Sequence, residues 1–551
     1  MFNTGRTLTP ALQSEASCDM GGGQCNHKMA FLRTAKVVAL AALLLSGCAQ
    51  EAAGPVEGFA GLVSADEPNA AVVGREVLGQ GGTAADAAVA MAFALTVTYP
   101  SRAGLDGGGA CLAYDFQKKS ADSLVFLPMP GATGTGTLPI MPRAMAALNA
   151  LHGSLRWELL VSPAENLARF GHDMSRALAQ DFAVGGQTLL SDPEAQAIWA
   201  PAGRVETGVP VVQAQLATTL SALRGQGAGY FHSSSFIARF GEATAAVGLP
   251  IDGDSLRVAV PQLIPPVRLL LDDSTTAWFT PPPDANGLLS AELYMMMSQM
   301  LDAGGDPRAE VLHLFLEASA QAFADRAGWL GPGGTSNMTP DQVLDESRLR
   351  NLAPNLGKGP HQPSATLRPT PEALVEPAGG TGFVVGDRYG NAVACSFTMN
   401  GLFGSGRMAP GTGMVLAAPP PGNLSVSPVA VLVASEGSGR FYFAAAGGDG
   451  AAAATSVARV LFEVLDNNTS LAEAMELGRV HHNGLPDVSF AEERIPVDLL
   501  QSLTQKGHNV RTLAAMGLVN AFYCPDSLPK GSSTCQVEND SRGFGLTQRA
   551  E

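Results

Sequence analysis

The segment at residues 83–97, TAADAAVAMAFALTV, most constrains the fold, because it is apolar on nearly every face. Such a pattern is typical of a helix buried on all sides. Gly81 and Gly82 precede it, and Tyr99–Pro100 provide a plausible stop. Its length falls short of the roughly 20 residues that a bilayer requires. The helix must therefore lie between layers of protein, and a 551-residue chain that is 46% hydrophobic can supply them.

The charge balance limits the partners of the chain. It has 34 basic and 50 acidic residues, for a net charge of −16. Duplex nucleic acid requires a basic face, so we exclude it as a partner. Small molecules or proteins are the expected partners.

The amino terminus has the pattern of an export signal. Arg33 and Lys36 precede a short apolar run at residues 37–45, which ends in Leu-Ser-Gly-Cys48. This ending resembles the bacterial lipobox, whose Cys is diacylated, and Met29 is a possible true start. We therefore expect residues 1–48 to be a signal segment and residues 49–57 a tether. The expected product is a lipid-anchored protein on the periplasmic side of a bacterial envelope; the alternative is cleavage nearby with Cys48 incidental.

The rest of the chain predicts a layered α/β core. Residues 381–399 read as a hairpin of two buried strands around the turn GDRYGN. Further expected elements are helices at 155–183, 211–224, 291–303 and 453–465, strands at 429–434 and 440–446, an ordered loop at 280–288, and a linker or cleavable loop at 351–379.

The cysteines and histidines show no metal-binding pattern. Cys524 and Cys535 flank a loop and could form a disulfide in an oxidising compartment, although sequence does not fix their distance. Cys111 and Cys395 lie in apolar surroundings, and no zinc spacing is present. The adjacent histidines at 481–482 are interpreted as structural or surface residues. We expect neither a metal nor a cofactor.

Several blocks of the chain resemble the γ-glutamyltransferase family. The resemblance implies an α/β Ntn-hydrolase fold, a four-layer αββα sandwich, and a precursor that cuts itself before a Thr. Residues 58–380 would form a large-subunit-like region and residues 381–551 a small-subunit-like region within one intertwined core. The matching blocks lie at residues 77–109, 280–287, 322–331, 386–406, 410–416 and 479–487.

The resemblance places the nucleophile at the start of the hairpin, where Thr381 follows Gly379 and Gly380. A Thr at a new amino terminus combines nucleophile and base, because its α-amine can accept the hydroxyl proton. Cleavage would then separate Gly380 from Thr381. A count back from Gly390–Asn391, however, puts the family position on Gly380, so an ordinary strand Thr at 381 stays the open alternative.

The resemblance also assigns supporting roles. Thr398 falls where the family has a Thr near the nucleophile, and Asn400 where it has a substrate contact. The GGDG turn, with Gly448, Asp449 and Gly450, falls at the oxyanion hole, whose backbone amides are preorganised donors. Ser425 stands near the family's substrate-binding Ser pair.

The head-group positions depart from the family. Leu127 replaces the Arg that would pair with a glutamyl carboxylate, and the stretch AAPPPGNLSVSP lacks the expected acid. Arg102 and Arg407 lie near site segments in the sequence and could compensate, but we assign neither of them that role. We therefore expect an N-terminal-Thr amide hydrolase or acyltransferase for a small amide or peptide other than a standard γ-glutamyl compound. The alternatives are an inactive envelope binding protein and a genuine glutathione or γ-glutamyl hydrolase-transferase.

Overall fold

The computed structural model describes residues 58–300, 307–370, 379–420 and 428–551. The expected signal segment, the tether, the lipidation residue Cys48 and the candidate Ser425 lie outside these residues. Among the residues described, no helix is long and apolar enough to cross a bilayer.

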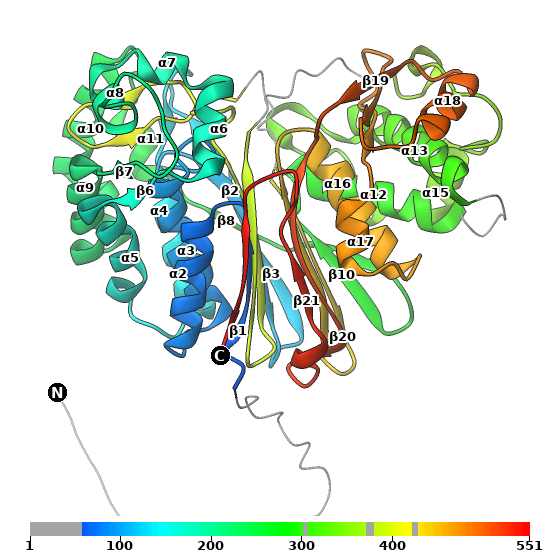
Figure 1. Ribbon diagram of the computed structural model, residues 1–551, viewed down its shortest axis with the longest axis horizontal. Helices are drawn as coiled ribbons and strands as arrows, with labels where there is room; N and C mark the ends of the chain where they lie inside the picture. The colour runs from blue at the N-terminus through cyan, green and yellow to red at the C-terminus, as the bar shows by residue number, and fades with distance from the viewer. Residues whose placement is uncertain (1–57, 301–306, 371–378, 421–427) are drawn as a thin grey trace, which may run out of the picture. The chain divides into compact units, whose positions relative to one another are not determined.

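Two sheets packed face to face form the centre of the protein, as Figure 1 shows with both seen nearly edge-on. In spatial order, the first sheet contains β22 (Leu546–Ala550), β1 (Gly61–Ala65), β11 (Thr381–Asp387), β12 (Ala392–Thr398), β2 (Gly108–Asp115), β3 (Ser120–Phe126) and β8 (Gln262–Ile264). The second contains β21 (Gln536–Glu538), β20 (Leu518–Leu528), β16 (Phe441–Gly448), β15 (Val429–Ser435), β10 (Thr275–Phe279) and β9 (Val267–Leu270). Apolar side chains such as Val384 and Ala444 fill the space between the sheets.

Helices cover the outer face of each sheet, which completes the four-layer αββα sandwich expected from the sequence (Figure 1). The first sheet carries α2 (Pro68–Gly79), α3 (Ala84–Thr98), α4 (Met141–His152), α5 (Trp157–Phe170), α6 (Arg176–Gly185), α7 (Gln187–Leu190), α8 (Pro193–Trp199), α9 (Ala214–Gln226), α10 (Ser234–Ala246) and α11 (Gly253–Val258). On the second side lie α12 (Ala285–Met300), α13 (Pro307–Trp329), α14 (Pro340–Val343), α15 (Glu346–Leu352), α16 (Ala452–Leu465), α17 (Leu471–Glu476) and α18 (Val497–Gln505).

The apolar helix that constrained the fold is α3, and every one of its residues is buried. Thr83 and Asp86 form a capping box at its start, so the polar groups of its first turn are satisfied although they are enclosed. Asp86 also accepts hydrogen bonds from the Ser154 and Leu155 backbone amides. Burial on all sides is therefore confirmed for this helix.

The strand predictions agree with the structure, but the predicted boundaries of one helix and one loop do not. The hairpin β11–β12 pairs Thr381 with Phe397 without a register shift. The expected helix at 155–183 is two helices, because the chain turns at Gly171, where φ is +90°. The expected loop at 280–288 was wrong in its second half, since α12 begins at Ala285.

The two sides of residue 380 share one sheet. β1 lies between β11 and β22, and β2 pairs with β12. A disulfide joins Cys111 of β2 to Cys395 directly across on β12, a pair that the sequence analysis did not assign. A second disulfide joins Cys524 and Cys535, the pair considered from the sequence. The first disulfide would therefore link the two chains covalently after a cut before Thr381.

Candidate active site

The site is built around the backbone that enters β11. The Gly379 carbonyl accepts hydrogen bonds from the amides of Asp449, at 2.9 Å, and Gly450, at 3.1 Å. These amides lie between the end of β16 and the start of α16, where backbone N–H groups have no partner within the helix. Asp449 has a φ of +79°, so the turn is held in a conformation that is rare for residues other than glycine. The expected turn residues therefore surround a backbone carbonyl at the start of β11.

Thr381 is fully buried and its hydroxyl points at a carboxylate. Thr381 Oγ1 donates to Asp66 Oδ2 at 2.8 Å, and the Gly382 amide donates to the same oxygen at 3.1 Å. Asn520 donates to the other carboxylate oxygen at 2.7 Å. Burial raises the pKa of Asp66 above its ordinary value, and these hydrogen bonds and Arg102 only partly oppose the rise. Asp66 is thus a proton acceptor of increased basicity in direct contact with the Thr381 hydroxyl.

Arg102 holds the carbonyl that precedes Thr381. Its Nη1 donates to the Gly380 oxygen at 3.0 Å and lies 3.2 Å from Asp449 Oδ1. Asp181 fixes the guanidinium through two hydrogen bonds, of 2.7 and 2.9 Å. Burial tends to lower the pKa of Arg102, but nearby Tyr99, Asp181 and Asp449 raise it overall, so the group is a permanent cation. A fixed positive charge therefore touches the Gly380 carbonyl.

Thr398 lies on the other face of the sheet from the Thr381 side chain. Continuing the hairpin register by one residue puts Thr398 opposite Gly380, and its neighbour two positions back, Ser396, donates to the Gly447 carbonyl of the second sheet. The backbone amide of Asn400 donates to Thr398 Oγ1 at 2.9 Å, so these two expected residues do lie together. The structure brings Thr398, Asn400 and the GGDG turn around Gly380, whereas the hydroxyl of Thr381 faces Asp66.

Three contributors were missed by sequence reasoning, namely Asp66, Asp181 and Asn520, and Arg102 was set aside. Asp66 follows a strand that begins the chain's core, and 315 residues separate it from Thr381. Only the pairing of β1 with β11 brings the two residues together. A buried Arg with a bidentate acidic partner had no local sequence signal, since Asp181 lies on a separate helix.

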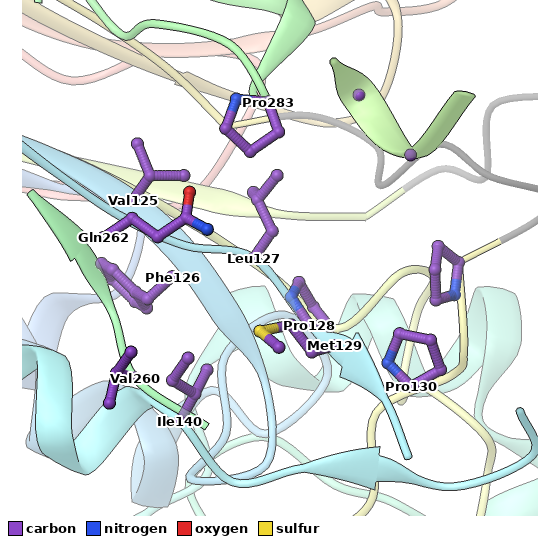
Figure 2. A pocket seen from close by; sticks show the side chains of 13 residues that line it. Val125, Phe126, Leu127, Pro128, Met129, Pro130, Ile140, Val260, Gln262 and Pro283 are labelled. Atoms are coloured by element: carbon purple, nitrogen blue, oxygen red, sulfur yellow. The ribbon is translucent and has the colours of Figure 1, made fainter. Parts of the chain in front are cut away.

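An apolar cavity of about 310 Å³ opens at the same end of the first sheet. Thr398 pairs with Gly108, and the next strand, β3, ends at Phe126, so that Phe126 and the following Pro128 lie beside that glycine. Figure 2 shows Leu127 among the side chains that line the cavity. None of the lining residues is charged; they are Val125, Phe126, Leu127, Pro128, Met129, Pro130, Ile140, Val260, Gln262, Pro283, Gly333, Gly334 and Pro420.

Comparison with known proteins agrees with this fold. The family model described as Gamma-glutamyltranspeptidase matches residues 70–418 and 423–542. The chain therefore belongs to the γ-glutamyltranspeptidase family. Membership makes it an amide hydrolase or acyltransferase of the Ntn-hydrolase class. The proenzyme names of its relatives agree with autoprocessing.

Two curated relatives and one solved structure illustrate the likeness. A glutathione hydrolase proenzyme of Escherichia coli (strain K12) is 27% identical, with 93% of this chain and 99% of the relative covered. An acylase ACY 1 proenzyme of Pseudomonas sp. (strain V22) is also 27% identical, with 88% and 93% covered. A cephalosporin acylase from Bacillus halodurans superposes with a TM-score of 0.75 at 19% identity, over 90% of this chain and 96% of that chain, which shows the shared fold.

Proposed function

We propose that the protein cleaves its own chain between Gly380 and Thr381 and then uses the amino-terminal Thr381 to hydrolyse or transfer an amide-linked acyl group. The observation that carries this proposal is the 2.8 Å hydrogen bond from Thr381 Oγ1 to the buried Asp66 carboxylate. A hydroxyl in contact with a base is the required start of nucleophilic attack.

The neighbouring groups support each step of the cut. Thr381 Oγ1 attacks the Gly380 carbonyl carbon while its proton passes to Asp66. The negative charge that develops on the Gly380 oxygen is stabilised by Arg102, which already donates to that oxygen. Asp66 returns this proton to the Thr381 nitrogen, the C–N bond breaks, and the Gly380 acyl group remains as an ester on Thr381 Oγ1 with the α-amine free. Water then hydrolyses the ester, which frees the Thr381 hydroxyl and a Gly380 carboxylate.

A second candidate is an uncleaved binding protein. The observation that favours it is the position of Gly380, the residue on which the count back from Gly390–Asn391 puts the family's nucleophile. Gly380 lies opposite Thr398 and directly follows Gly379, whose carbonyl is held by the Asp449 and Gly450 amides. Glycine has no hydroxyl, so a nucleophile at this position would be absent.

Electrophoresis under reducing conditions separates the two candidates. We expect a large chain and a small chain whose first residue is Thr381. Without reductant, the same sample should run as one species, because Cys111 and Cys395 join the two chains. A Cys111→Ala/Cys395→Ala variant should split under both conditions. A single full-length band in the presence of reductant would refute the proposed cleavage and favour the binding protein.

We further propose that the acyl group is apolar and uncharged. The cavity at the same end of the first sheet has no charged lining residue, and Leu127 is 8% exposed where a carboxylate-binding Arg would be expected. A charged head group would lose its water there without gaining a partner, at a cost of several kcal/mol.

The acyl preference predicts the behaviour of two substrates and two variants. We expect the mature protein to turn over a medium-chain acyl p-nitroanilide with a kcat/KM at least about tenfold above that for the γ-glutamyl compound. Leu127→Arg should reduce turnover of the apolar substrate about tenfold or more, whereas the volume-conserving Leu127→Met should change it little. Equal or faster turnover of the γ-glutamyl compound would contradict an apolar acyl site.

For location, we propose export and lipid anchoring through Cys48, supported by the charged, apolar and small-residue order of the amino terminus and by the two disulfides. Cells that express the full chain are grown with radiolabelled palmitate. The wild type and a Cys25→Ala control should both carry the label. The Cys48→Ala variant should carry no label. Label that persists in Cys48→Ala would show that the anchor is elsewhere.

A further inference from the structure

A cluster of histidines and carboxylates lies beneath the outer helices of the second sheet, apart from the candidate active site. α13 contributes His313 and Glu317, which are four residues apart and so lie on one face of the helix. His508 comes from the turn between α18 and β19 (Val510–Leu513) and packs against them. All three side chains are buried, with relative exposures of 0%, 5% and 3% for His313, Glu317 and His508.

The ligand atoms of these residues converge. His313 Nδ1 lies 2.8 Å from His508 Nε2, and His508 Nε2 lies 3.8 Å from Glu317 Oε1. One potential ligand atom from each of the three residues lies within 4.8 Å of the other two. In a tetrahedral Zn²⁺ site with bonds of about 2.0–2.2 Å, ligand atoms are about 3.3–3.5 Å apart. The two measured distances bracket that spacing, so small side-chain shifts would seat an ion.

Outer hydrogen bonds orient the same atoms. His508 Nδ1 lies 2.9 Å from Ser489 Oγ, and donation of the Nδ1 proton to that hydroxyl leaves the Nε2 lone pair facing the cluster. Glu317 Oε2 accepts from the Gln362 amide at 3.0 Å. His361 stands next to the cluster, with its Nδ1 2.5 Å from Glu317 Oε1 and its Nε2 3.1 Å from Asp487 Oδ1. Such outer partners are what fix the ligands of a metal site.

A neighbouring trio is a weaker candidate. His361, His482 and Asp487 also bring donor atoms together. The Gly484 amide, however, donates to His482 Nδ1 at 3.0 Å, which leaves the proton of neutral His482 on Nε2, the atom that faces Asp487. A metal could bind His482 Nε2 only if this hydrogen bond broke, so this trio fits an internal hydrogen-bond network instead, whereas His313 can carry its proton on Nε2 and leave Nδ1 free for an ion.

We propose that His313, Glu317 and His508 bind one divalent transition-metal ion, for which Zn²⁺ has the best match of ligand type. Two imidazole nitrogens and one carboxylate oxygen suit Zn²⁺. His313 and Glu317 precede residue 380 and His508 follows it, so the ion would join the large-subunit-like and small-subunit-like regions. This site is independent of the proposed Thr381 chemistry.

The test uses the full exported chain, stripped with a chelator and then exposed to Zn²⁺ or Co²⁺. We expect uptake of one Zn²⁺ per chain by elemental analysis, a higher melting temperature with Zn²⁺, and the visible absorption bands of tetrahedral Co²⁺. His313→Asn and His508→Asn should each weaken Zn²⁺ binding by at least about tenfold.

The matched control is His232→Asn, a histidine that binds the Leu256 carbonyl far along the chain from the cluster and should not affect uptake. Glu317→Gln keeps the size of the side chain and serves if a histidine variant fails to fold. A stripped wild-type chain that takes up no Zn²⁺ and gives no Co²⁺ spectrum would overturn the site. Binding that is unchanged in folded variants at positions 313, 317 and 508 would overturn it as well.

Discussion

Replacing Thr381 with Ala should abolish both self-cleavage and turnover, and the variant should run as one full-length band in the presence of reductant. The reason is chemical, because Ala has no hydroxyl to attack the Gly380 carbonyl. Thr381→Ser should still cleave, since it keeps the hydroxyl whose proton Asp66 accepts. Band intensities over time and the first residue of the small chain measure the result.

The Ala variant needs a stability control, because Thr381 is fully buried and bound to Asp66. Removing the hydroxyl deprives the buried carboxylate of one donor, at a cost of about 1–3 kcal/mol in unfolding free energy. The melting temperatures of Thr381→Ala and Thr381→Ser therefore have to be compared. A folded Thr381→Ala variant that still splits would show that another residue is the nucleophile, and the sequence of the new amino terminus would identify it.

The framework of the fold could be predicted because it depends on local patterns. The uninterrupted apolar face of α3 indicated burial on all sides, and the run of β-forming residues around GDRYGN indicated the hairpin β11–β12. The helix that follows the GGDG turn was also predicted, at 453–465, and is observed as α16 at Ala452–Leu465.

The partners of the site residues could not be predicted, because they depend on which strands become neighbours. Asp66 meets Thr381 only since β1 inserts between β11 and β22. Asn520 reaches Asp66 from the second sheet, through a contact between residues 454 positions apart. The cross-strand disulfide between Cys111 and Cys395 has the same origin, because nothing near either cysteine specifies that β2 lies beside β12.

The raised pKa of Asp66 predicts how self-cleavage depends on pH. Only the carboxylate form accepts the Thr381 proton, so the cleavage rate should be low at acidic pH and rise as pH increases through the pKa of this group. Because burial raises that pKa, the midpoint of the rise should lie above 3.8, the ordinary value of an Asp. Cleavage of an initially intact precursor, followed by electrophoresis at a series of pH values, measures the midpoint.

Asp66→Asn should slow self-cleavage by about 10²- to 10⁴-fold and remove this acid limb, since the amide is not a base. The matched control is Asp387→Asn at the opposite end of β11. Asp387 is also buried with a raised pKa, but it binds the Ala84 and Asn391 amides and does not touch Thr381. The control should keep the wild-type pH midpoint whatever its effect on stability. If Asp66→Asn cleaves at the wild-type rate with the same midpoint, Asp66 is a structural partner of Thr381 and another group accepts the proton.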